Sequence, residues 1–241
     1  KLLKFRKKNK SFKFLSFPTI SGSGPNSAII HYKANKKSNR ILKKRDIYLV
    51  DSGGQYSFGT TDVTRTLSLA NKDKMIKNIF TRVLNGHIAV ANYNLKKDTT
   101  GKEIDLVARK SLKKVNLDYP HGTGHGVGCF LNVHEGPQAI SRGNVVKFKE
   151  GMVTSNEPGF YKKNHFGIRI ENLIYVKKNK EKMCFENLTL VPIEKNLINK
   201  KLLNSTEVKW INKYHSFVFK NLKKFMNKFE LAQLKDACSN I

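Results

Sequence analysis

Four acidic residues and one histidine occupy positions that folding alone would not favour. Asp51 ends an apolar run, and Asp62 begins the next stretch of alternating β-branched and polar residues. Glu157 precedes a proline, Glu171 lies within an alternating stretch, and His125 is surrounded by glycines. Each acid alone would be interpreted as a cap or a surface pair, but buried carboxylates are unfavourable unless they are paired or bind metal. Together the five form an oxygen-rich set that suits two divalent cations, with manganese favoured.

These residues need strands and helices to position them. The capping box Thr100–Glu103 predicts the start of one helix, and Asn71 is expected to cap another that ends near Asn92. Amphipathic helices are also expected towards the C-terminus, between Trp210 and Leu234. Strands are predicted at 28–32, 47–51, 62–69, 152–156, 168–176 and 188–192. This order predicts an α+β domain with a mostly antiparallel sheet and helices outside it.

The charge of the chain is strongly positive. It has 241 residues, with 46 Lys and Arg against 18 Asp and Glu, so the formal net charge is 46 − 18 = +28. Such a charge suits phosphate binding, but the basic residues are mostly lysines interleaved with asparagine and spread along the chain. We interpret them as solvated surface charge, which affects solubility and steering rather than chemistry. A nucleic-acid partner is not expected.

Hydropathy and cysteine usage restrict the class of protein further. Hydrophobic residues make up 39% of the chain, enough for a core, yet no apolar run is long enough to span a membrane. The N-terminal residues carry charge where a signal peptide needs an apolar stretch. Cys129, Cys184 and Cys238 are widely spaced, which favours neither a disulfide framework nor a thiolate zinc site. A soluble protein of a reducing compartment is expected.

A series of ordered motifs gives the sequence a family resemblance. They include His-Gly-Thr-Gly-His-Gly-Val-Gly at 121–128, Asn-Glu-Pro-Gly-Phe at 156–160 and Gly-Ile-Arg-Ile-Glu-Asn at 167–172. Further matching strings lie at 16–21, 24–31, 51–56, 59–66, 86–90, 132–137 and 185–192. The chain resembles the catalytic domain of aminopeptidase P, in peptidase family M24, whose pita-bread fold is shared with prolidase, creatinase and methionine aminopeptidase. The string Val-His-Glu-Gly-Pro and the segment after Pro192 resemble the eukaryotic cytosolic type.

The resemblance implies a fold, a cofactor and a reaction. The fold would be a curved, mostly antiparallel sheet with helices on its outer face, and the cofactor two Mn²⁺ per chain. Asp62 and Glu171 would bridge the two ions, Asp51 would complete one site, and His125 with Glu157 the other. A hydroxide shared by the two ions would attack the peptide carbonyl, and Glu157 would transfer the proton. The reaction implied is removal of the first residue from a peptide whose second residue is proline.

Four further residues match the substrate side of the family's site. The resemblance implies that His31, His121 and His134 are catalytic residues that bind the substrate and stabilise the tetrahedral intermediate. Arg169 lies two residues before Glu171, so both side chains face the same side of a strand. Arg169 either orients a ligand carboxylate or a substrate group, or forms a structural ion pair. The remaining histidines, 87, 165 and 215, are expected to be structural.

The expected domain organisation has three parts. Residues 1–15 form a basic lead-in, as the remnant of a preceding segment; residues 16–193 form the catalytic domain; residues 194–241 form its helical extension. Members of the cytosolic type carry further domains ahead of this one. The resemblance also implies a homodimer, a cytoplasmic location, peptide substrates and no membrane association. Two other functions stay open: a prolidase-type dipeptidase, and a non-catalytic pita-bread module that binds protein or nucleic acid.

Overall fold

The computed structural model describes residues 1–70, 73–180 and 182–241. Its α-helices are α1 (Leu2–Arg6), α2 (Lys74–Ala91), α3 (Gly101–Lys113), α4 (Ser205–Leu222) and α5 (Lys228–Ala237). Its strands are β1 (Phe12–Phe14), β2 (Ile20–Ser23), β3 (Ile47–Asp51), β4 (Gln55–Tyr56), β5 (Gly59–Thr60), β6 (Thr64–Ser68), β7 (Gly124–His125), β8 (Ala139–Ile140), β9 (Val153–Asn156), β10 (Gly159–Lys162), β11 (Phe166–Arg169), β12 (Asn172–Asn179) and β13 (Lys182–Asn187). Short 3₁₀ helices lie at Gly24–Ala28, Lys195–Leu197, Lys200–Leu202 and Lys223–Phe225.

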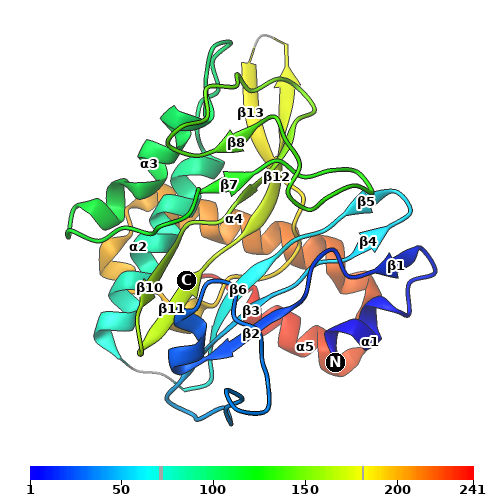
Figure 1. Ribbon diagram of the computed structural model, residues 1–241, viewed down its shortest axis with the longest axis vertical. Coiled ribbons are helices and arrows are strands. Elements are labelled where there is room, and N and C mark those ends of the chain that lie inside the picture. Colours follow the sequence, from blue (N-terminus) through cyan, green and yellow to red (C-terminus); the bar gives the residue numbers. More distant parts are fainter. Residues whose placement is uncertain (71–72, 181) are drawn as a thin grey trace.

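The described strands pair in an antiparallel manner throughout. They form small sheets in the orders β2-β3-β6, β13-β12-β9, β1-β4-β5, β10-β11 and β7-β8. Figure 1 shows the strands in front, with α2 and α3 on one side and α4 and α5 behind them. The predicted α+β pita-bread fold, with a mostly antiparallel sheet and helices outside it, is confirmed.

The core lies between the helices and the strands. The apolar face of α2 packs with β10, β11, α4 and α5, in a cluster that includes Phe80, Ile168 and Val218. A second cluster joins α3 to β12 and β13 through Ile104, Ile174 and their neighbours. The helices therefore support the strands through these two apolar clusters.

The helix predictions are confirmed with one displaced boundary. At α3, Thr100 and Glu103 form the predicted capping box. At α2, the N-cap is Asp73, whose carboxylate accepts hydrogen bonds from the backbone N–H groups of Met75 and Ile76. The predicted cap, Asn71, lies outside the described residues.

Two predicted strands are wrong. Residues 28–32 do not form a strand: a 3₁₀ helix with a proline in its first turn ends at Ala28, and its Ser27 hydroxyl closes the turn by donating to the carbonyl of Gly24 at 2.6 Å. Residues 188–192 are not paired as a strand either. Their carbonyls accept side-chain hydrogen bonds instead, because Arg65 donates to the carbonyl of Val191 at 2.6 Å.

One predicted strand is divided in two. The stretch 168–176 spans the end of β11 and the start of β12, with Ile170 and Glu171 between them. β10, which pairs with β11, was not predicted. The break matters because it leaves the Glu171 N–H to donate to the carbonyl of Thr64 at 3.1 Å, which joins β6 to this segment.

The first residues are tied to the strands that follow. β1 pairs with β4, and Arg6 of α1 donates to the hydroxyl of Ser52 at 2.7 Å and to its carbonyl at 3.0 Å. Ser52 directly follows Asp51, so this segment contacts the end of β3. The division into a lead-in, a catalytic domain and an extension stays a proposal.

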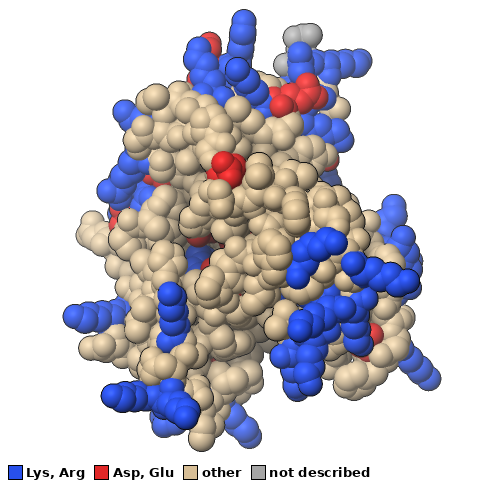
Figure 2. All heavy atoms as spheres, turned by 45° about the vertical axis from the view of Figure 1, so that its right-hand side comes forward, with Lys and Arg blue, Asp and Glu red and all other residues tan. Residues whose placement is uncertain are grey.

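The surface and the helices agree with the charge and hydropathy of the sequence. Lys and Arg side chains project from all around the face shown in Figure 2, rather than from one stripe. None of the described helices is long and apolar enough to cross a bilayer. The three cysteines are free.

Two fully buried histidines should make the fold sensitive to acid. Burial lowers the pKa of His215 to about 4 and that of His87 to about 3. The unfolded chain therefore binds more protons below the ordinary histidine pKa, so stability is complete above about pH 6.5 and decreases as the pH falls towards about 4. His215 accepts a hydrogen bond from the Ile193 N–H at 3.1 Å, which the imidazolium cannot do.

We expect His215→Gln to remove part of this acid sensitivity. The loss of unfolding free energy between pH 6.5 and 4, measured by urea denaturation, should be smaller than in the parent by up to about 3 kcal/mol. His165→Gln, a change at an exposed histidine, is the matched control and should keep the parent's slope. An unchanged slope in His215→Gln would contradict the assignment.

Candidate metal centre

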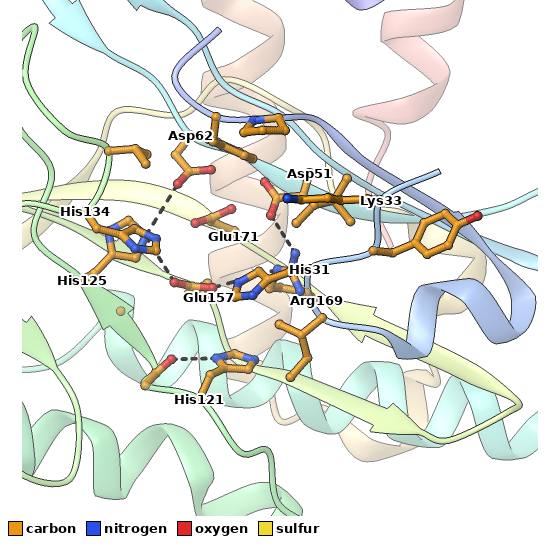
Figure 3. Close-up of a pocket in the computed structure, with 18 residues that line it drawn as sticks. His31, Lys33, Asp51, Asp62, His121, His125, His134, Glu157, Arg169 and Glu171 are labelled. Atoms are coloured by element: carbon orange, nitrogen blue, oxygen red, sulfur yellow. Dashed lines mark hydrogen bonds and ion pairs between the residues drawn. The ribbon is translucent and has the colours of Figure 1, made fainter. Parts of the chain in front are cut away.

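A pocket of about 500 Å³ opens on the side of the sheets away from the helices and contains all nine predicted site residues. Its walls come from segments far apart in the sequence, as Figure 3 shows. The lining residues are Phe17, Pro18, Ile20, Ile30, His31, Tyr32, Lys33, Asp51, Asp62, His121, Gly122, Gly124, His125, Val133, His134, Glu157, Arg169 and Glu171.

The five predicted metal ligands occupy strand ends and the short connections between strands. Asp51 is the last residue of β3, and Asp62 precedes β6. His125 ends β7, Glu157 follows β9, and Glu171 lies in the break between β11 and β12. At these positions the chain leaves the sheets, so one side chain from each segment can turn into the same space (Figure 3).

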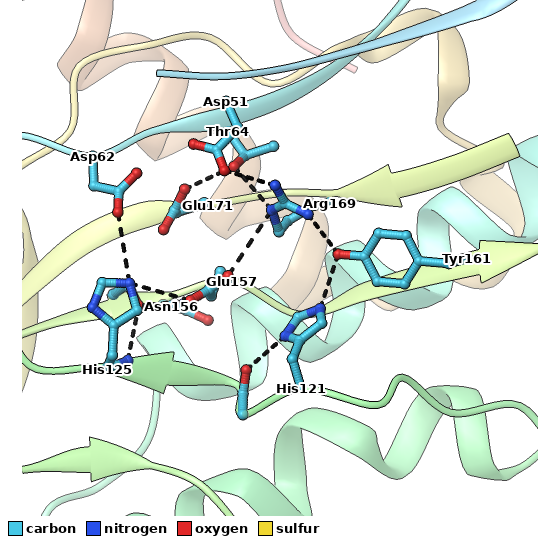
Figure 4. A network of polar contacts seen from close by, with 12 residues as sticks. Asp51, Asp62, Thr64, His121, His125, Asn156, Glu157, Tyr161, Arg169 and Glu171 are labelled. Atoms are coloured by element: carbon cyan, nitrogen blue, oxygen red, sulfur yellow. Dashed lines mark hydrogen bonds and ion pairs between the residues drawn. The ribbon is translucent and has the colours of Figure 1, made fainter. Parts of the chain in front are cut away.

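The ligand atoms come close to one another. Asp62, His125 and Glu171 each offer an atom within 4.8 Å of the others. His125 Nε2 lies 3.6 Å from Asp62 Oδ2 and 3.3 Å from Glu157 Oε1 (Figure 4). All five predicted ligands line this one pocket, and their role as ligands is taken up below as a proposal.

The carboxylates of this cluster need a cation. Burial, followed by the neighbouring acids, raises the pKa of Asp62 and of Glu157 well above their usual range, and burial together with Asp51 raises that of Glu171 to about 7. Asp51 Oδ1 and Asp62 Oδ1 are buried and have no hydrogen-bond partner among the described residues. Unpartnered buried carboxylate oxygens are unfavourable, and divalent cations would satisfy them. The residues present therefore fit a metal centre.

His125 is prepared to act as a neutral ligand. Its Nδ1 lies 3.0 Å from the carbonyl of Gly126, so Nδ1 carries the proton and the Nε2 lone pair faces the acids. Burial, with His134 adding to it, lowers the pKa of His125 to about 4. The ring is thus unprotonated at neutral pH, as metal binding requires.

Arg169 lies deep in the pocket and is already paired. Its side chain is 2% exposed, and its guanidinium donates to Asp51 Oδ2 at 2.6 Å and to the hydroxyl of Thr64 at 3.1 Å. The ion pair with Asp51 agrees with both roles left open by the sequence, the orientation of a ligand carboxylate and a structural ion pair. A direct contact with substrate stays a prediction.

The sequence analysis missed Tyr161, which links Arg169 to a predicted substrate-side histidine. The Tyr161 hydroxyl accepts from Arg169 at 2.7 Å and lies 2.9 Å from His121 Nε2 (Figure 4). Since His121 Nδ1 faces the carbonyl of Gly122 at 2.8 Å, the tyrosine is the donor to Nε2. Burial raises the pKa of Tyr161 to about 12 and lowers that of His121 to about 4, which keeps both neutral. The one sequence signal that could have identified Tyr161 is the alternation of inward and outward side chains along β10.

Helix α3 also positions this histidine. Its buried Asp105 and Arg109 form an ion pair at 2.7 Å, and Arg109 donates to the carbonyl of His121 at 2.6 Å. Asp105 accepts from the hydroxyl of Thr123 at 2.6 Å. The buried Asp105–Arg109 pair therefore fixes the loop that carries His121. The spacing of the two residues on a helix did not indicate this role in the sequence.

For the peptidase activity that the sequence resemblance implies, we expect Tyr161→Phe to lower kcat/KM by about 10-fold, because it removes the hydroxyl that orients His121 and leaves the ring in place. Thermal unfolding should show a fold close to the parent's. Tyr175→Phe is the matched control, since its hydroxyl bonds Glu186 at 2.8 Å on the β12–β13 hairpin. An equal effect of both substitutions would assign the loss to general destabilisation.

The two other predicted histidines line the same pocket as His121. The rings of His134 and His125 have centroids 4.0 Å apart, and burial lowers the pKa of His134. His31 also lines this pocket and is exposed. The histidines expected to be structural lie elsewhere: His87 is fully buried against Trp210, and 165 and 215 are outside the pocket.

Comparison with known families identifies the class of protein. The family described as metallopeptidase family M24 matches residues 1–178, and the C-terminal region of peptidase M24 matches residues 181–241. The acid-rich pocket agrees with a metallopeptidase fold. The chain belongs to metallopeptidase family M24.

Individual relatives show which members of the family the chain resembles. The chain is 49% identical to "Probable Xaa-Pro aminopeptidase P" of Laccaria bicolor over 90% of its length, and it covers 35% of that protein. The X-prolyl aminopeptidase of Caenorhabditis elegans, described as a cytosolic enzyme with a di-nuclear active site, superposes with a TM-score of 0.94 at 39% identity, over 99% of this chain and 41% of that one. The prolidase of Pyrococcus furiosus gives 0.66 at 30% identity, over 74% and 50%. The predicted likeness to aminopeptidase P is confirmed, and the chain spans roughly a third of the length of the curated relatives it matches.

Proposed function

We propose that the protein is a metal-dependent Xaa-Pro aminopeptidase, which removes the first residue from peptides with proline in the second position. The observation that carries the proposal is the convergence of five ligand-type side chains in one pocket, where Asp51 Oδ1 and Asp62 Oδ1 are buried without a hydrogen-bond partner among the described residues. The names of the relatives support the substrate class, since both a 49% identical protein and the structure with a TM-score of 0.94 are described as X-Pro aminopeptidases.

We propose that two Mn²⁺ bind in this pocket. Asp51, Asp62, His125, Glu157 and Glu171 would hold the two ions. Bound divalent cations would supply a Lewis acid for the peptide carbonyl and activate water at neutral pH. The hard oxygen donors favour manganese over a thiolate-seeking metal.

The protein's own groups carry the remaining steps. Glu157 accepts a proton from the attacking water on its carboxylate and delivers it to the proline nitrogen that leaves. Arg169 holds Asp51 in place through the 2.6 Å ion pair.

The substrate side of the pocket is formed by histidines. His31, His121 and His134 hydrogen-bond the carbonyl of the scissile bond and hold the peptide, which stabilises the charge that develops on that oxygen. A peptide bond to proline has no N–H, and the ring fixes the chain, so this site needs no backbone acceptor there. Apolar neighbours such as Ile30 and Val133 provide a surface for the ring.

Location and assembly follow the relatives. The cytosolic description of the Caenorhabditis elegans enzyme supports a cytoplasmic location. A homodimer stays a proposal from family resemblance. An analytical ultracentrifugation run of the protein tests the dimer directly.

A peptide panel separates the proposed function from its alternatives. After manganese loading, the protein should release the first residue of Arg-Pro-Pro and act poorly on the dipeptide Gly-Pro. Preference for Gly-Pro would indicate a prolidase. Failure to cleave either peptide, with manganese bound, would indicate a non-catalytic module.

A further inference from the structure

The loop after the 3₁₀ helix brings one lysine to the wall of the pocket. Lys33 lines the pocket together with His31 and Tyr32, and Figure 3 shows its side chain on the Asp51 side of the site. Tyr32 anchors this position: its ring is buried, its hydroxyl donates to the carbonyl of Ser38 at 2.9 Å, and its N–H donates to that of Ile29 at 3.1 Å. The backbone that carries Lys33 is therefore fixed at the pocket wall.

The ammonium group of Lys33 is available to a ligand. It has no hydrogen bond or ion pair with any part of the chain that the structure describes, and its side chain is exposed. Arg169 is the other Lys or Arg side chain that lines the pocket, and it is bound to Asp51, Thr64 and Tyr161. Of the two cationic side chains that line the pocket, Lys33 is therefore the one without a partner among the described residues.

The position of this cation has consequences for substrate choice. Lys33 lines the same pocket as the acids and its side chain is exposed, so a peptide bound at the acids would come within reach of its ammonium group. A carboxylate within about 4–6 Å of an ammonium group is attracted to it, more strongly at a partly enclosed wall than in free solution. A neutral or cationic group at the same place gains nothing or is repelled.

We propose that Lys33 makes the site selective for peptides that carry a carboxylate near the scissile bond. This inference depends on the proposed function, since it concerns which Xaa-Pro peptides are preferred. The carboxylate has two possible sources with the same chemistry: the side chain of an acidic first residue, or the free C-terminus of a short peptide. Lys33 binds and orients the substrate and takes no part in the bond cleavage.

Three peptides test the inference and distinguish the two sources. Glu-Pro-Ala-amide against Gln-Pro-Ala-amide isolates a side-chain carboxylate, and Gln-Pro-Ala with a free C-terminus against its amide isolates a terminal one. The parent should favour the charged member of at least one pair in kcat/KM. Lys33→Gln should reduce that preference by about 3-fold, and Lys33→Glu by about 10-fold, the range expected of a partly exposed ion pair. The activity of Lys36→Glu on Gln-Pro-Ala-amide should stay within about 2-fold of the parent.

The matched control is Lys36→Glu, an equal charge reversal at an exposed lysine of the same loop that does not line the pocket. It should keep both preferences of the parent. The inference is overturned if Lys33→Glu keeps them too, or if Lys36→Glu reduces them equally, since the effect would then come from the overall charge. Failure of the manganese-loaded parent to cleave any of the three peptides contradicts the proposed function itself, a separate result.

Discussion

Glu157→Gln should lower the turnover of Arg-Pro-Pro by at least about 10²–10⁴-fold, the usual contribution of a group that transfers protons in a reaction. The amide has the shape of the carboxylate but cannot take a proton from water or return one to the proline nitrogen. It can still accept the 3.2 Å hydrogen bond from the Ser155 hydroxyl. Because the substitution also removes one buried like charge, circular dichroism and the unfolding temperature of the metal-free protein should show an intact fold.

The control for this substitution is Glu150→Gln, at an exposed acid in the turn before β9. It should leave turnover as in the parent. If Glu157→Gln cleaves Arg-Pro-Pro at the parent's rate, the proton-transfer role assigned to Glu157 is wrong, whatever else the pocket does.

Removal of metal should have an effect of similar size. Dialysis against a chelator should abolish hydrolysis of Arg-Pro-Pro, and added Mn²⁺ should restore it better than Zn²⁺, because the donor set is mostly carboxylate oxygen. A second measurement does not depend on activity. Mn²⁺ at 100 times its dissociation constant should stabilise the fold by about 2.7 kcal/mol and raise the unfolding temperature accordingly.

Asp62→Asn separates binding in this pocket from binding elsewhere on the surface. It removes the charge of a carboxylate whose Oδ1 is buried without a partner, so it should lose most of the Mn²⁺-dependent rise in unfolding temperature. Asp98→Asn, at an exposed acid paired with Lys147, should keep that rise. Full activity after chelation, or the same stabilisation in Asp62→Asn as in the parent, would show that the five side chains do not form the metal centre.

Local sequence patterns correctly predicted the helices α2 and α3, because the interactions that start and support these helices lie close together in the sequence. The period of α2 and the capping box of α3 depend on residues within one or two turns, so the sequence contains the whole signal. Segments 28–32 and 188–192 have the composition of strands but do not form them. In 28–32 the N–H groups of Ile29 and Tyr32 donate to nearby carbonyls within turns. In 188–192 the carbonyl of Val191 accepts a hydrogen bond from the distant Arg65, and pairing of this kind has no short-range pattern.

The sequence by itself determined the type and order of the site residues. Acids at strand ends and a histidine among glycines are anomalous locally, and the ordered motifs gave the family. The tertiary structure decided which atoms meet: the 2.6 Å contact of Arg169 with Asp51, the Tyr161 bridge to His121, and the unpaired ammonium of Lys33 at the pocket wall. The reason is that burial and electrostatic coupling depend on distances between segments more than 100 residues apart, such as Asp51 and Arg169, and only the folded chain sets those distances.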